Sequence, residues 1–89
     1  MTATMATLAR IDAKRLEKAR EGLARGDYSV TVQRHTAGWL NGEVTSREGV
    51  TYTLTATPSL TSCTCPDVRY ARKAGHVCKH AAMLALMAA

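Results

Sequence analysis

The sequence predicts a small α+β domain with an N-terminal helix, an antiparallel sheet of three to four strands, a short spacer helix and a C-terminal helix. Three observations support this fold class. Helical spacing of apolar residues early in the chain gives way to a period of two in the middle, and the chain ends in the apolar segment AAMLALMAA. With 89 residues, the chain is expected to form one domain, residues 1–89, whose modest core would benefit from a covalent or metal cross-link.

The first helix is expected between Asp12 and Gly26. Asp12 is a good N-cap, and Gly26 suits the position just past the helix end. Four residues from Leu16 to Leu23 fall at i, i+3, i+4 and i+7, the spacing of one helix face. The first ten or so residues have no such pattern, so we expect them to be frayed.

The middle of the chain is typical of half-buried antiparallel strands. In YSVTVQR (28–34) and VTYTLTA (50–56), apolar and polar residues alternate. A weaker strand is expected from Leu40 to Thr45, but Asn41-Gly42 is also a hairpin signal, so the register of this strand stays open. The segment TPSL indicates a turn, after which LTSCTC is expected to return as the second arm of a hairpin.

A pair of cysteines ends this hairpin. Cys63 and Cys65 are two residues apart, so on an extended strand their side chains leave the same face. Pro66 favours an extended conformation at the residue before it, which preserves this arrangement. The next segment, DVRYARKAG, predicts a short helix that Asp67 caps and Gly75 ends in a left-handed turn.

A cysteine and a histidine form a second pair, Cys78 and His80. On a continuous helix, residues two apart point about 200° away from each other and could not share one metal ion. We therefore expect Cys78 in the turn before the C-terminal helix and His80 in the first turn of that helix. The large side chains from Met83 to Met87 would share the face of His80, toward the sheet, and the alanines would fill the opposite side.

Three thiolates and an imidazole form a closed tetrahedral set, which is the ligand set of one structural Zn²⁺ ion. Sulfur ligands favour Zn²⁺ over Mg²⁺ or Ca²⁺. His76 is the main rival of His80 as the fourth ligand. A redox-active dithiol is one alternative, but it leaves the Cys78–His80 pair unexplained. Buried structural cysteines at chance spacing are a second alternative.

The pattern Cys-x-Cys, spacer, Cys-x-His resembles the SWIM zinc finger family, and CTCPD and CKHAAMLAL are similar to its motif. The strand YTLTA is similar to the family's first strand. The resemblance therefore implies a β-β-α zinc unit over residues 50–89, which a helix and strands in residues 12–49 extend. By this resemblance, the zinc ligands are Cys63, Cys65, Cys78 and His80. Family members occur beside helicase-like ATPases, transposases and ubiquitin-pathway proteins, which implies binding to DNA or to other proteins.

The formal net charge of +5 is compatible with an acidic partner, although solubility alone would also explain it. Basic residues on the first helix alternate with glutamates, which is typical of a solvated face. A less balanced set follows the cysteine pair and is the better candidate nucleic-acid surface: Arg69, Arg72, Lys73 and Lys79.

Two functions fit these observations: a nucleic-acid-binding module, with DNA as the first candidate, or a protein–protein interaction adaptor in which zinc is purely structural. The sequence has no nucleophile–base pair, paired carboxylates or Gly-rich phosphate loop, so we expect no catalysis and no small-molecule substrate. No signal peptide is recognisable, and AAMLALMAA is too short for a bilayer, which takes about 20 residues. We therefore expect a cytoplasmic location without a membrane partner.

Overall fold

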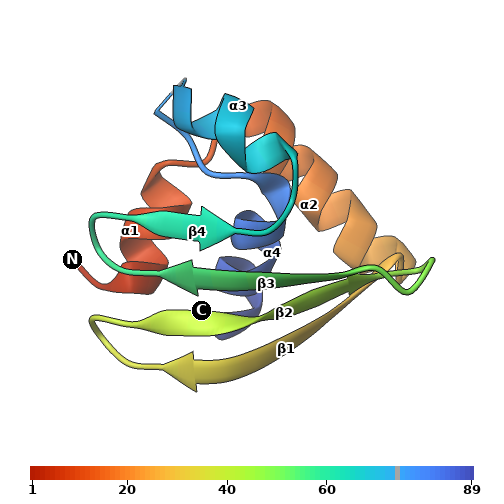
Figure 1. The fold of residues 1–89 in the computed structure, drawn as a ribbon, viewed down its shortest axis with the longest axis horizontal. Helices are drawn as coiled ribbons and strands as arrows, with labels where there is room; N and C mark the ends of the chain where they lie inside the picture. Colours follow the sequence, from red (N-terminus) through yellow and green to blue (C-terminus); the bar gives the residue numbers. More distant parts are fainter. Residues whose placement is uncertain (74) are drawn as a thin grey trace.

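The structure is a computed structural model and describes residues 1–73 and 75–89, except for the side chain of Arg72 (Figure 1). It confirms the predicted α+β class. The helices and strands are α1 (Ala3–Ala9), α2 (Ala13–Arg25), β1 (Tyr28–His35), β2 (Leu40–Ser46), β3 (Thr51–Ala56), β4 (Thr61–Cys63), α3 (Asp67–Lys73) and α4 (Lys79–Ala88).

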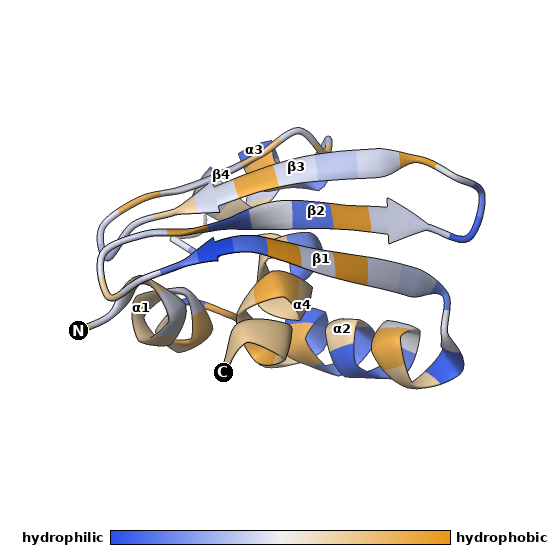
Figure 2. Ribbon diagram, turned by 90° about the horizontal axis from the view of Figure 1, so that it is seen from below, coloured by the Kyte–Doolittle hydropathy of each residue, from blue (hydrophilic) through white to orange (hydrophobic). Residues whose placement is uncertain are grey.

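The strands form one antiparallel sheet in the order β1-β2-β3-β4. Figure 2 shows α1, α4 and α2 side by side against one face of this sheet. Alternate residues of β2, Leu40 and Val44 among them, are buried against these helices. The site described below lies at the end of this two-layer arrangement where β4 and α4 meet (Figure 1).

The N-terminal residues are not frayed, so that prediction was wrong. Thr2 caps α1, because its hydroxyl accepts a hydrogen bond from the amide of Met5 at 3.1 Å. Ala3 and Thr7 are fully buried, and the Thr7 hydroxyl donates to the Ala3 carbonyl at 2.8 Å. The buried face of α1 consists of alanine and threonine, so the pattern of large apolar residues that predicts a helix is missing.

Helix α2 confirms the expected caps. The Asp12 carboxylate accepts a hydrogen bond from the backbone amide of Arg15 at 3.2 Å, and Gly26 ends the helix in the left-handed region at φ 73°. Gly26 can adopt this conformation without the steric cost that a Cβ would add.

The structure settles the register of the strand that the sequence left open. Asn41 and Gly42 lie inside β2 and pair with both β1 and β3, so they do not form a hairpin turn. The turn is instead at Thr36–Trp39, where the Thr36 amide donates to the Trp39 carbonyl at 2.8 Å. Burial of one face of β2 outweighs the local turn preference of the Asn-Gly pair.

Gly42 marks a close approach between the sheet and α4. A Cβ at this position would collide with the backbone carbonyl oxygen of Thr31 and would lie 2.8 Å from Leu84 Cδ1. Gly42→Ala is therefore expected to lower the free energy of unfolding by roughly 3 kcal/mol, because a strand must move to relieve the clash. Urea unfolding of the zinc-loaded protein measures the change. Gly38→Ala is the control, since nothing lies within 4 Å of a Cβ there; equal stability of both variants would contradict the assignment.

Helix α4 is the centre of the core and packs against α1, α2 and all four strands. Met83 and Leu84 are fully buried, as expected, but Met87 is 56% exposed, so its predicted burial was wrong. The alanines on the opposite side are also buried, as Ala82 and Ala85 show. Their small side chains allow α1 and α2 to approach α4 closely.

Within residues 1–73 and 75–89, none of the helices has both the length and the apolar character needed to cross a membrane. Helix α4, which contains most of the apolar C-terminal segment, has ten residues and packs against α1, α2 and the sheet.

Candidate metal centre

Four potential metal ligands converge where β4 and α4 meet. Cys63 is the last residue of β4, and Cys65 lies two residues further on in the turn that leads to α3. Cys78 is the N-cap of α4 and His80 is in its first turn, as the sequence analysis expected. The four donor atoms all lie within 4.8 Å of one another. In a tetrahedral zinc site with Zn–S distances of about 2.3 Å, neighbouring sulfurs are roughly 3.8 Å apart, so the cluster fits one zinc ion.

The burial of the cluster also fits a closed structural site. Cys65, Cys78 and His80 are buried, and Cys63 is half-buried. The ring nitrogen Nδ1 of His80 is buried without a hydrogen-bond partner among the described residues. Burying a ring nitrogen without a partner costs free energy. A metal bound at Nδ1 would offset this cost, and a metal bound at the other ring nitrogen would fix the tautomer of the imidazole.

Hydrogen bonds within the cluster separate the pKa values of its thiols. Bonds from Cys63 and then Cys78 hold the pKa of Cys65 far below its ordinary value. The bond to Cys65 is the main reason why the pKa of Cys63 is raised, and burial adds to this rise. Sulfur atoms close enough to share protons are also close enough to bind one metal ion together. The metal would replace the protons, which are released when it binds.

Two tyrosines hold the imidazole of His80, and the sequence analysis did not single them out. The Tyr52 ring stacks on it at a centroid distance of 4.3 Å, and the Tyr28 ring meets it edge-on at 5.7 Å. Gly22 of α2 leaves room for Tyr28, because a Cβ there would lie 2.9 Å from the ring. The alternation in β1 and β3 predicts inward-facing tyrosines, but only the fold places them beside His80.

The rival ligand His76 faces away from the cluster. Its Nδ1 lies 3.2 Å from the backbone carbonyl oxygen of Arg10, which also accepts a hydrogen bond from the Val77 amide. This carbonyl belongs to the connection between α1 and α2, so the N-terminal region braces the segment just before Cys78. The structure thus brings His80, and not His76, to the three sulfurs.

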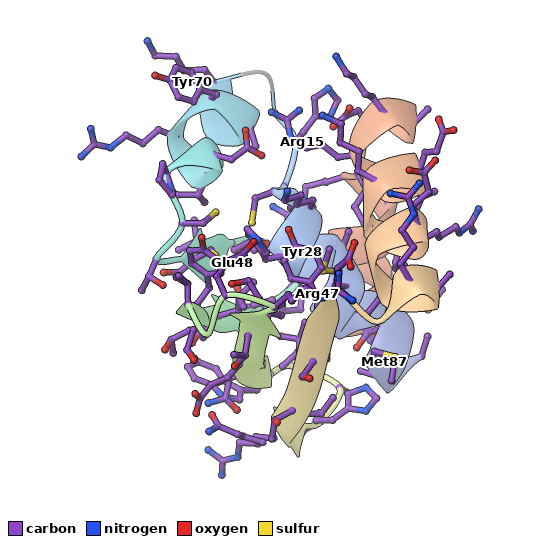
Figure 3. The ribbon with its side chains drawn as sticks, turned by 90° about the vertical axis from the view of Figure 1, so that its right-hand side faces the viewer. Arg15, Tyr28, Arg47, Glu48, Tyr70 and Met87 are labelled. Carbon is purple, nitrogen blue, oxygen red and sulfur yellow. The ribbon has the colours of Figure 1, made fainter. Side chains whose placement is uncertain are left out.

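Arg15 connects α2 to the first residue of α3, and Figure 3 shows it between these two helices. Its guanidinium makes two hydrogen bonds to the Asp67 carboxylate, at 2.9 and 3.1 Å, and one to Asp12 at 3.0 Å. These bonds lower the pKa of both carboxyl groups and raise the pKa of Arg15. The interpretation of the basic residues of α2 as a solvated face was therefore wrong for Arg15.

The basic residues expected to bind nucleic acid do not form one continuous set. Arg69 and Lys73 are exposed on α3, and the side chain of Arg72 lies outside the described part of the structure. Lys79 is partly buried and lines a hollow with residues of α2, whereas Arg69 lines a different hollow beside the cysteine pair. Figure 3 shows Tyr70, an aromatic residue that was not among the predicted site residues, on the outer side of α3.

A β-hairpin and the start of a helix that together present three sulfurs and one imidazole define a zinc finger. Residues 52–89 match the family model of the SWIM zinc finger, which confirms the resemblance that the sequence motif carries. The match contains the whole candidate metal centre. No curated protein and no solved structure matches the chain.

Proposed function

We propose that the chain is a non-catalytic module that binds nucleic acid and that one structural zinc ion stabilises it. Its zinc ligands would be Cys63, Cys65, Cys78 and His80. The ion would connect the end of β4 to the start of α4, and every donor would be a protein side chain. Because a closed ligand set leaves no position for a substrate or a reactive water, the role of the metal is structural.

The observation that carries the nucleic-acid proposal is the exposed surface of α3. Arg69 and Lys73 lie one helical turn apart, and Tyr70 between them is 69% exposed. An exposed aromatic ring beside two cations suits an unpaired base and its flanking phosphates, since bases stack on such rings in a sequence-tolerant way. The net charge of +5 also favours association with a polyanion.

Binding is expected to be weak, largely independent of sequence and steeply dependent on salt. Three or four phosphate contacts give a slope of log affinity against log salt of about −3 to −4 on duplex DNA, and somewhat less on single strands. The variant Arg69→Ser/Lys73→Ser should lower both the affinity and the slope, and Tyr70→Ser should mainly weaken binding to single strands. Fluorescence anisotropy with duplex and single-stranded oligonucleotides at several salt concentrations measures these quantities.

The matched control removes the same charge elsewhere. Arg20 and Arg25 are exposed on α2, and Arg20→Ser/Arg25→Ser should change binding little if α3 is the contact surface. Zinc content has to stay at one ion per chain in all variants. An absence of binding at about 50 mM salt, to duplex and to single strands, would remove the nucleic-acid proposal.

An interaction adaptor is the second candidate, and one feature of the sheet favours it. Strand β1 (Tyr28–His35) is an edge strand, and its residues from Thr31 onward are exposed. An open edge can accept a strand from a partner protein, which would bind through backbone hydrogen bonds and with little salt dependence. The salt series above therefore separates the two candidates. The three free cysteines support a reducing location such as the cytoplasm for either one.

A further inference from the structure

A second basic feature is a hollow that basic residues of α2 help to line, and it is distinct from the hollow that Arg69 and Tyr70 line. The hollow has a volume of about 470 Å³. Its lining comes from α2, from the first residue of α3 and from the first residue of α4: Lys14, Arg15, Lys18, Asp67 and Lys79. Four of these residues are cationic and one is anionic, so the hollow has an excess of positive charge.

Internal pairing removes only part of this charge. Arg15 and Asp67 are bound to each other, and Asp12 occupies the remaining side of the guanidinium. In the part of the chain that the structure describes, no ion pair engages Lys14, Lys18 or Lys79. Three of the lysines that line the hollow therefore have no anionic partner among the described residues.

The positions of these lysines are constrained. Lys14 and Lys18 are four residues apart on α2, so they lie one turn apart on the same face, where like charges destabilise a helix by a few tenths of a kcal/mol. Lys79 lies between Cys78 and His80 and is partly buried, and its Nζ is 5.5 Å from the centroid of the Tyr28 ring. An anion in the hollow would attract all three cations and so offset the repulsion between them.

We propose that this hollow binds a phosphate group, with Lys14, Lys18 and Lys79 as its cationic contacts. Lysine is a compact point charge that suits a phosphate, whereas a planar carboxylate is better matched by a free guanidinium. The guanidinium in this hollow is already occupied by two carboxylates, which disfavours an acidic peptide. The volume exceeds that of a single phosphate, so the group can belong to a larger molecule.

The phosphate could belong to a nucleic-acid strand, and in that case the inference rests on the proposed function. It could also belong to a free phosphate compound, and the site would then be independent of nucleic acid. Inorganic pyrophosphate is a suitable probe because it carries the shared chemistry without a base or a sugar.

The test is an NMR titration of the ¹⁵N-labelled, zinc-loaded protein with pyrophosphate at constant ionic strength. Saturable shifts of the amides of Lys14, Lys18 and Lys79 are expected. Lys14→Ser/Lys18→Ser and Lys79→Ser should weaken binding by about two- to fivefold for each lysine removed. Arg20→Ser/Arg25→Ser is the matched control, because it removes two cations from the same helix outside the hollow.

Shifts that do not saturate, or an equal loss of affinity in the control variant, would overturn the phosphate site. Unchanged affinity in both lysine variants would overturn it as well, provided that their spectra stay dispersed. A single-stranded oligonucleotide that displaces pyrophosphate would identify the strand as the source of the phosphate. If pyrophosphate stays bound in excess oligonucleotide, the site stands and serves a free phosphate compound, whether or not the nucleic-acid proposal survives.

Discussion

Removal of zinc is expected to unfold the protein. Structural zinc contributes roughly 10–16 kcal/mol of apparent binding free energy in zinc-finger peptides, and a whole small domain is typically stable by only about 5–15 kcal/mol. The four ligands also join the end of β4 to the start of α4, which is the helix at the centre of the core. Without the ion, the folded state would keep two thiols and an imidazole buried with no metal to compensate for the loss of their hydration.

Far-UV circular dichroism and amide dispersion during titration with a chelator measure this effect, and metal analysis should give one zinc per chain. Added Zn²⁺ should restore both signals, whereas excess Mg²⁺ should not, because sulfur ligands disfavour it. Acidification should also release the ion, since its ligands must be deprotonated to bind. A metal-free protein that still unfolds cooperatively would refute the requirement for zinc.

The second large effect is expected at His80. His80→Ala removes one of four donors and the ring that packs between Tyr28 and Tyr52, so zinc affinity should fall strongly and α4 should lose its anchored start. His76→Ala is the matched comparison. It removes a hydrogen bond to the Arg10 carbonyl, which contributes about 1 kcal/mol, and leaves the four donors intact.

Competition with a chromophoric chelator measures the zinc affinity of both variants, and thermal unfolding measures their stability. The affinity should decrease by orders of magnitude only for His80→Ala. A strong loss in His76→Ala with a mild effect in His80→Ala would reassign the fourth ligand. Equal, mild effects in both would show that neither histidine completes the site.

The metal centre could be predicted because its information is local. The four ligands form two short pairs, Cys63/Cys65 and Cys78/His80. Pro66 after the first pair and an apolar helix after the second limit how these side chains can be oriented, so the sequence alone shows that they can meet at one point. The exclusion of a continuous helix through Cys78 and His80 correctly placed Cys78 before α4 and His80 in its first turn. The same kind of local evidence predicted both ends of α2.

Features that depend on several distant segments could not be predicted. The buried face of α1 carries only alanine and threonine, Ala3 and Thr7 among them, so no stripe of large apolar residues marks this helix in the sequence. The bonds from Arg15 to Asp67 join residues 52 positions apart. The lysine hollow likewise unites α2 with the first residue of α4. The sequence shows which residues are cationic, but it does not show which other residues lie next to them in the fold.

Because α4 packs against elements from the whole chain, the residues that match the family model are fewer than the residues that enclose this helix. The ligands and the family match lie within residues 52–89, which could be copied into another protein as a short cassette. That cassette would leave behind β1 and β2, the helices that cover the alanine side of α4, and Tyr28 beside the imidazole. A recipient protein would have to provide other helices that pack against the alanine side of α4. The segment that matches the family model is thus shorter than the segment that is needed for the fold around α4.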